Sequence, residues 1–195
     1  MRRNYNTNIL PNGFTKLQYI QSTGTQYIEL ENPYDWNSWK FECRGEFTQL
    51  TSDRQHLFGN DSGNYEINNN GTCTYNGVTK NLYGLIHTVT YEHRKITNTN
   101  KYRKTYTLDG ELWTDFESTW NANSYISFFK HHYAVNEVWS RPAYAKLYYA
   151  KLYHDDVLIH DFIPAKRNSD NVVGLYDIIT NTFYTNNGTG TFLYE

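Results

Sequence analysis

The stretch WKFECRGEF, residues 39–47, indicates the fold class of this chain. Its apolar and charged residues alternate, which places Trp39, Phe41, Cys43, Gly45 and Phe47 on one face and Lys40, Glu42, Arg44 and Glu46 on the other. Successive side chains of a β-strand point to opposite faces of the sheet, so this pattern predicts an antiparallel strand with one buried face. We interpret Cys43 as a small apolar residue of that buried face.

Short segments of the same kind recur on both sides of this strand, separated by turns rich in Asn, Gly, Asp and Ser. The strongest hairpin signal is Asp109-Gly110, because both residues suit the positive φ angles of a type I′ turn. Asp155-Asp156 marks another turn, and Pro164 is expected to end the strand that follows, since proline cannot donate a ladder hydrogen bond. Roughly twelve short strands, with turns every 8–12 residues, predict a β-sandwich or barrel.

The pentapeptide YAKLY occurs twice in tandem, at residues 144–148 and 149–153. A period of five residues reverses the face of a strand from one copy to the next, because side chains alternate with a period of two. The repeat therefore predicts one long strand with aromatic side chains on both faces, as in strands that are buried on both sides.

Composition agrees with an all-β protein and excludes several classes of protein. The 195 residues include 19 Tyr, 10 Phe and 5 Trp but only 6 Ala, and aromatic rings suit pleated sheets whereas Ala favours helices. No stretch approaches the ~20 apolar residues of a membrane span, so no membrane contact is expected. The net charge of −2, the pI of 6.4 and the lack of a recognition motif argue against a nucleic-acid partner.

Residues 1–13 are polar and Asn-rich, and they lack the periodicity of a strand or a helix. We expect them to form an extended N-terminal arm outside a single domain of residues 14–195. Tyr5, Ile9 and Leu10 are the residues that we expect to dock this arm on a neighbouring protein, because disordered arms commonly order when they bind.

Both ends of the chain resemble a known family. LQYIQSTGTQYIEL (residues 17–30) and DFIPAKRNSDNVVGLYDIITNTFYTNNGTGTF (residues 161–192) are similar to the opening and closing signatures of a jelly-roll family of gut-bacterial surface proteins and their phages. Residues 87–112 resemble, more loosely, a stretch of laminin-G-like and concanavalin A-like sandwiches. The resemblance implies an all-β, antiparallel two-sheet jelly roll over residues 14–195, with its first and last strands close together. It implies little about function, because one fold serves many functions.

Enzymatic activity is not expected. Glycoside hydrolysis requires two carboxylates across a cleft, about 5–9 Å apart, and the ExDxxE strand of laminarinase-like enzymes is missing from this sequence. The nearest acidic pairs are Glu29/Glu31, at the end of a strand, and Asp155/Asp156, whose adjacent side chains point apart. No nucleophile motif of the GxSxG kind occurs.

No cofactor is expected either. Cys43 and Cys73 do not make a zinc site, and without a secretion signal we expect both thiols to be free. A weak calcium candidate is the loop at residues 59–66, which does not match the DxDxDG pattern and needs no metal to form a turn. Its oxygen ligands are Asn60, Asp61, Asn64 and Glu66.

Trp36, Trp120 and Trp139 lie in polar, loop-like surroundings and are the candidates for contact with a glycan or a protein partner. Sugars stack on such rings, and protein interfaces are enriched in them as well. Composition does not separate these two kinds of partner.

Three functions follow from these observations. The first is a non-enzymatic structural protein of a phage virion, a capsid-attached auxiliary, decoration or head-fibre component whose lectin-like surface contacts host glycans. Its partners would be capsid subunits, fibres or further copies of itself, and it would assemble in the host cytoplasm. The alternative is a glycan-binding module of a bacterial surface protein, and the third function is a glycoside hydrolase, for which the carboxylate pair is missing. The lack of a secretion signal favours the virion.

Overall fold

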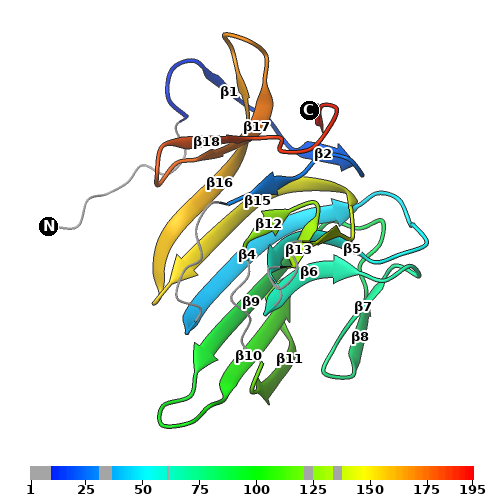
Figure 1. The fold of residues 1–195 in the computed structure, drawn as a ribbon, viewed down its shortest axis with the longest axis vertical. Helices are drawn as coiled ribbons and strands as arrows, with labels where there is room; N and C mark the ends of the chain where they lie inside the picture. The colour runs from blue at the N-terminus through cyan, green and yellow to red at the C-terminus, as the bar shows by residue number, and fades with distance from the viewer. Residues whose placement is uncertain (1–9, 31–36, 61, 121–124, 134–137) are drawn as a thin grey trace, which may run out of the picture.

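The computed structural model describes residues 10–30, 37–60, 62–120, 125–133 and 138–195, with the backbone alone for residues 132, 133, 138 and 139. Every element in these ranges is a β-strand (Figure 1), and they contain no helix that could cross a membrane. The strands are β1 (Phe14–Lys16), β2 (Ile20–Thr23), β3 (Ile28–Glu29), β4 (Ser38–Phe47), β5 (Gln55–Asn60), β6 (Gly63–Ile67), β7 (Thr72–Tyr75), β8 (Val78–Asn81), β9 (His87–Lys95), β10 (Tyr102–Leu108), β11 (Glu111–Ser118), β12 (Ser127–Phe128), β13 (His131–Tyr133), β14 (Val138–Ser140), β15 (Tyr144–His154), β16 (Val157–Arg167), β17 (Val173–Asp177), β18 (Thr182–Thr185) and β19 (Leu193–Tyr194).

The strands form a two-layered sandwich. One large sheet has the strand order β11-β10-β9-β4-β15-β16-β17-β18, with β1, β2 and β19 paired alongside it. A smaller sheet of order β3-β12-β5-β6 covers one face of the large sheet, and all pairs within the two sheets are antiparallel (Figure 1). The chain therefore has the antiparallel two-sheet jelly-roll fold that the sequence predicts.

Aromatic rings fill the space between the two sheets. On the buried face of β4, Phe41 packs against Phe58 of β5 with ring centroids 5.1 Å apart, and Phe47 packs against Tyr65 of β6 at 5.3 Å. Phe58 stacks in turn on Phe128 of β12 at 4.4 Å. Such pairs contribute about 0.5–1.5 kcal/mol beyond the burial of their surface. The core thus accounts for many of the rings that composition alone would assign to a binding surface.

Several local predictions are confirmed. Asp109 and Gly110 have φ angles of 52° and 87°, and the second predicted turn, at residues 155–156, also has positive φ at both positions. Cys43 and Cys73 are buried free thiols, and burial raises the pKa of Cys73 to about 12.

The tandem repeat forms one long strand, β15, as predicted. The expectation of aromatic side chains on both of its faces is wrong, because β15 contains a β-bulge. Leu147 pairs with Gly45 of β4, but the next pairing joins Tyr149 to Arg44, so one extra residue is accommodated between them. The five-residue period alone would turn the second copy of YAKLY to the opposite face, and the extra residue turns it back to the same face as the first copy. In both copies of YAKLY the Ala and Leu are buried while the Tyr and Lys are half-exposed on the outer face. Gly45 lies opposite the bulge and faces Leu57 of the small sheet, where a Cβ would clash.

Pro164 does not end β16, contrary to the expectation from the sequence. Along one edge, the strand pairs with β15 up to Phe162 and with β1 from Ala165 onward. Along the other edge, it pairs with β17 from Phe162 to Lys166. Pro164 lies where the strand exchanges one neighbour for another, a place where a missing N–H is tolerated. Its carbonyl accepts a hydrogen bond from the Leu17 N–H at 2.9 Å.

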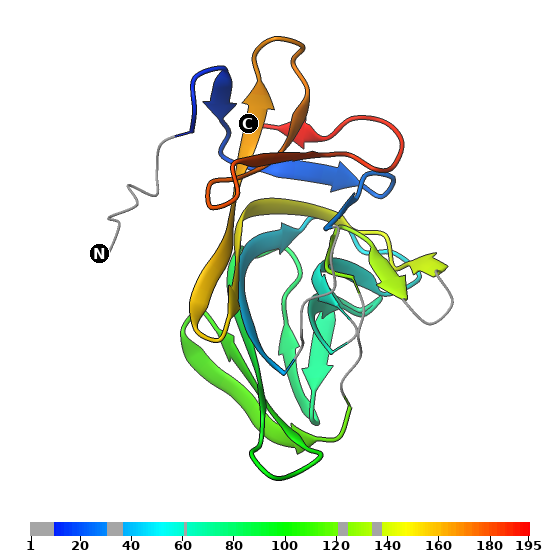
Figure 2. The same ribbon diagram turned by 60° about the vertical axis from the view of Figure 1, so that its left-hand side comes forward.

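This exchange divides the molecule into a sandwich and a smaller end. Figure 2 shows β16, in orange, leaving the sandwich and entering a second group of strands. We refer to that group as the terminal lobe: β1, β17, β18, β19 and residues 162–167 of β16.

The opening and closing signature segments hydrogen-bond to each other. Asn186 Oδ1 accepts the N–H of Tyr27 at 3.1 Å, and Asn187 Oδ1 accepts the N–H of Glu29 at 3.1 Å. The backbone N–H of Asn187 donates to the Tyr27 carbonyl at 2.8 Å. We refer to these contacts between residues 20–29 and 186–194 as the clasp. They explain why the first and last strands are close together, as the resemblance implies.

Gln26 occupies the centre of the clasp and is buried. Its side-chain amide donates to the carbonyl of Thr191 at 3.1 Å, and its Oε1 accepts the N–H of Thr23 at 2.8 Å. Gly188 permits the close approach of the two segments, because a Cβ at that position would clash with the Thr25 carbonyl.

We predict that Gln26→Ala lowers the free energy of unfolding by about 1–3 kcal/mol, because it leaves buried backbone groups without their partners. Urea unfolding followed by tryptophan fluorescence measures this change. Gln18→Ala is the matched control: Gln18 is exposed, and its loss should cost no more than about 0.5 kcal/mol. Equal effects of the two substitutions would contradict a role for the clasp.

Two buried histidines are kept neutral by their surroundings. The ring of His56 lies 4.9 Å from that of His131, and burial, followed by the proximity of His131, lowers the pKa of His56 well below 6.5. Arg141 opposes protonation of His56 as well. Burial, with a contribution from Lys104, lowers the pKa of His93 to about 3.

These depressed pKa values predict a loss of stability in acid. Each histidine binds a proton in the unfolded chain below about pH 6.5 but not in the folded protein, so the free energy of unfolding falls by up to about 1.4 kcal/mol per pH unit for each. His93→Gln should reduce the slope of unfolding free energy against pH between 6.5 and 4. An identical slope in the unmodified protein and in the His93→Gln variant would refute the assignment.

Candidate functional site

The structure places one of the three tryptophans predicted to contact a partner. Trp120 follows β11, at one edge of the large sheet, and is 60% exposed. Trp139 lies in β14, where the backbone alone is described, and Trp36 lies outside the described residues. Trp113 is buried and donates its indole N–H to the Val78 carbonyl at 3.1 Å. The contact roles of Trp36, Trp120 and Trp139 therefore stay predictions.

The predicted docking arm is described only at its end. Leu10 is half-buried, whereas Tyr5 and Ile9 lie outside the described residues. β1 begins at Phe14, directly after the predicted boundary of the arm. Docking through residues 1–13 stays a prediction.

The described calcium candidates bond to other protein groups. Asn60 Oδ1 accepts backbone N–H groups of the turn that follows it, and Glu66 pairs with Arg141 at 2.7 Å. Asn64 Oδ1 lies 3.0 Å from a tyrosine hydroxyl, and Asp61 lies outside the described residues. Among the residues that the structure describes, no three His, Cys, Asp or Glu side chains are grouped to hold a metal ion.

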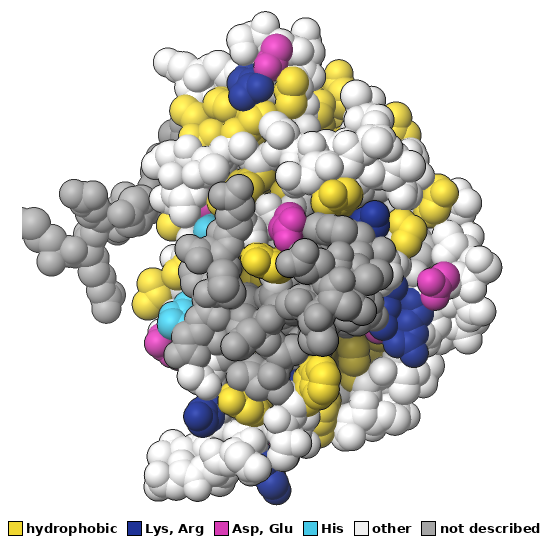
Figure 3. Space-filling view, in the orientation of Figure 1, with side chains coloured by type: hydrophobic (Ala, Val, Ile, Leu, Met, Phe, Trp, Pro, Cys, Tyr) yellow, Lys and Arg dark blue, Asp and Glu magenta, His cyan; other side chains and the backbone are white. Residues whose placement is uncertain are grey.

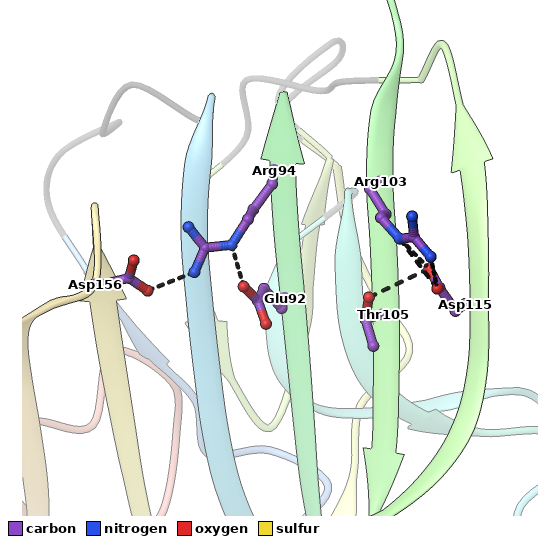
Figure 4. Close-up of polar contacts among 6 residues, drawn as sticks. All are labelled: Glu92, Arg94, Arg103, Thr105, Asp115 and Asp156. Atoms are coloured by element: carbon purple, nitrogen blue, oxygen red, sulfur yellow. Dashed lines mark hydrogen bonds and ion pairs between the residues drawn. The ribbon is translucent and has the colours of Figure 1, made fainter. Parts of the chain in front are cut away.

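The outer face of the large sheet is charged, but its charges neutralise one another (Figure 4). Arg94 binds both Glu92 and Asp156, the latter at 2.5 Å, and Arg103 donates to Asp115. These contacts lower the pKa of Asp115 and Asp156. Exposed ion pairs of this kind contribute little to stability, but each charge in them already has a partner of opposite sign.

The outer tyrosines of β15 also contact neighbouring side chains. Lys40 Nζ lies 4.2 Å from the ring centroid of Tyr153, and Tyr148 packs edge-on against Tyr19 at 5.7 Å. Lys146 Nζ lies 4.9 Å from the Tyr19 ring. A sugar ring would have to displace these lysines in order to stack. We therefore interpret this face as a solvated sheet surface.

The terminal lobe contains a hollow of about 540 Å³. It lies between the turn that joins β16 to β17 and the segment that leads from β18 to β19, which both occupy the same end of the molecule in Figures 1 and 2. We refer to it as the Asn171 hollow. Its lining includes Asp170, Asn171, Thr185, Thr191, Phe192 and Tyr194.

Three polar side chains in this lining have free hydrogen-bonding capacity. The amide of Asn171 and the hydroxyls of Thr185 and Thr191 make no hydrogen bond with any other described residue. Tyr194 is 48% exposed, whereas Phe192 is buried. Lys166 Nζ lies 5.8 Å from the centroid of the Tyr194 ring, farther than the lysines over the tyrosines of the outer face. An amide, two hydroxyls and an exposed ring can together donate to, accept from and stack on a polyhydroxylated ligand.

An ion pair stabilises the turn that presents Asn171. Arg167 donates to Asp170 at 2.7 Å, and Asp170 also accepts the N–H of Val172 at 3.2 Å. The guanidinium of Arg167 lowers the pKa of Asp170, so this carboxylate stays ionised at neutral pH. Asn171 has a φ of 61°, a left-handed conformation that asparagine adopts more readily than most residues.

Aromatic packing supports the same lobe from outside. Hydrophobic side chains gather over β1, β17 and β18 on the face shown in Figure 3. Phe14 packs against Tyr176 at 4.8 Å and against Phe183 at 5.0 Å, and the Arg167 guanidinium lies 5.4 Å from the Phe183 ring. This cluster joins the three strands and so fixes the frame around the hollow.

Sequence reasoning missed this hollow because its polar residues look like ordinary turn formers. Asn and Thr are frequent in turns, and nothing local distinguishes Asn171 from the other asparagines. The signal that was present is the closing signature, which contains both the 168–171 turn and the 186–190 loop.

Comparison with known proteins supports the fold. No protein-family model matches the sequence, and no curated protein is similar to it. The structure is similar to that of a candidate carbohydrate-binding protein from Bacteroides ovatus, with a TM-score of 0.55 and 13% sequence identity. The match covers 93% of this chain but only 60% of the other chain. At this identity the similarity establishes a shared fold, here an all-β sandwich.

Proposed function

We propose that this protein binds carbohydrate in the Asn171 hollow and does not cleave it. The observation that carries the proposal is the group of unpaired polar side chains, Asn171, Thr185 and Thr191, beside the exposed ring of Tyr194. Asn171 and Thr191 are exposed and Thr185 is half-buried, so the hydroxyl groups of a sugar can reach them and replace the water that they bind.

The comparisons support this function over the others. The Bacteroides ovatus protein, which has the same fold, is described in terms of carbohydrate binding, and gut-bacterial surface proteins are the group that the terminal signatures resemble. A glycan-binding module is therefore the function we favour. The role in a phage virion stays a prediction, because nothing in the fold or the comparisons bears on it.

Binding without cleavage is the expectation from the carboxylates near the hollow. Hydrolysis of a glycosidic bond requires one carboxyl group that can donate a proton and a second one across the cleft. Asp170 lines the Asn171 hollow, and Arg167 lowers its pKa, so it is not suited to donate a proton. Glu29 lines the neighbouring space along β18. Of the pairs considered from the sequence, Asp156 is bound by Arg94 in an exposed turn.

We predict that Asn171→Ala and Tyr194→Ala each weaken binding of a neutral glycan about tenfold, a loss of about 1.4 kcal/mol. Isothermal titration calorimetry, with ligands first identified on a glycan array, measures the affinities. Trp120→Ala tests the competing site and should bind as the unmodified protein does. Loss of binding in Trp120→Ala alone would move the site to the opposite edge of the large sheet.

We also predict that the protein releases no reducing sugar from laminarin or xylan. Glu29→Gln and Asp156→Asn variants serve as controls for any background activity. Release that is present in the unmodified protein and absent from either variant would show that the protein is a hydrolase.

A further inference from the structure

A second hollow adjoins the Asn171 hollow. It has a volume of about 340 Å³ and lies along β18 opposite β3, and we refer to it as the Glu29 hollow. Its lining includes Glu29, Thr182, Phe183 and Tyr184. It combines two rings with short polar side chains, the same kinds of group that line the first hollow.

The two hollows meet at one residue. Thr185 lines both of them, and the next two residues are divided between them, with Asn186 in the Asn171 hollow and Asn187 in the Glu29 hollow. Each volume falls within the range of about 300–1,000 Å³ that is typical of small-ligand sites. Thr185 is therefore the residue at which a ligand larger than one hollow would pass into the other.

The chain between the hollows is held in place by the clasp. Asn186 Oδ1 accepts N–H groups of Tyr27 and Gly188, and its amide donates to the Gly190 carbonyl at 3.0 Å. Asn187 is bonded to residues 27 and 29 as described above. Binding that requires no rearrangement of this segment avoids the entropic cost of ordering it.

Neither hollow has a cation in its lining. Asp170 lines one and Glu29 the other, and the described lining residues include no Lys, Arg or His. The cations nearest to the lining are already engaged, Arg167 by Asp170 and Lys166 by the Tyr194 ring, 5.8 Å from its Nζ. A uronic acid carboxylate would lose part of its hydration beside Asp170 and Glu29 without gaining an unpaired positive partner, which is unfavourable. Neutral sugar units carry no such penalty.

From the shared Thr185 and the lack of a lining cation, we infer that the ligand is a neutral linear oligosaccharide whose units occupy both hollows. This inference rests on the proposed function. It adds that the site recognises a chain of at least two linked units and discriminates against polyuronates.

Calorimetric titration with laminari-, xylo- and malto-oligosaccharides of one to six units tests the inference, with oligogalacturonides of the same lengths as the charged counterpart. In the series that binds, affinity should rise at least tenfold between one unit and four units. Oligogalacturonides should bind at least tenfold more weakly than the neutral chain of equal length. Affinity that is the same for one unit and for six, or equal binding of the uronate series, would overturn the inference while leaving the proposed function intact.

A blocking variant locates the second subsite. Thr182 is exposed on a strand, where tyrosine is well tolerated, so Thr182→Tyr should fill the Glu29 hollow and leave the fold intact. It should reduce the affinity for the four-unit chain to that for the shortest ligand and leave the latter unchanged. Thr79→Tyr, on the exposed strand β8, is the matched control and should have no effect. An unchanged affinity of Thr182→Tyr for long chains would refute the second subsite, and failure of every saccharide to bind the folded protein would refute the proposed function itself.

Discussion

The antiparallel pairing of β15 with β4 is the constraint on which the rest of the molecule depends. These strands lie at the centre of the large sheet, and their register decides which side chains face the small sheet. The bulge opposite Gly45 keeps Ala and Leu of both YAKLY copies on the buried side. Along its other edge, β15 pairs with β2 before the bulge and with β16 after it. β16 then continues into the terminal lobe, which contains the hollows.

The aromatic content has a different meaning in the structure from the one that composition suggests. Rings such as Phe41, Phe58 and Tyr65 form the core. Outer tyrosines of β15 contact lysine side chains or, for Tyr148, the ring of Tyr19. In a chain with so many rings, an abundance of Tyr and Trp is poor evidence for a binding surface. Unpaired polar groups are more informative here, and in the terminal lobe Asn171 and two threonines provide them.

Features that depend on local chemistry could be predicted from the sequence. The alternation of β4 follows from burial of one face, and the turn at Asp109-Gly110 follows from the φ angles that these residues tolerate. The faces of the YAKLY repeat could not be predicted from the repeat alone, because they depend on a bulge in the pairing with a distant strand, where β15 lies opposite Gly45 of β4. That glycine was visible inside the β4 pattern, and glycine within a strand often marks a bulge. The continuation of β16 past Pro164 depends on which strands become its neighbours, and the hollows depend on how two turns face each other. Neither is a local property.

The clasp also determines the order in which this chain can acquire its structure. Its hydrogen bonds join residues near position 27 to residues near position 187, so the segment that it closes includes most of the chain. Contacts between such distant residues form late, because the entropy of closing the intervening loop must be lost before they stabilise anything. During synthesis, the sandwich strands β4 to β15 emerge and can pair before the 186–191 loop exists. Both hollows are consequently formed only when the C-terminal segment, which lines them, folds against the rest of the chain.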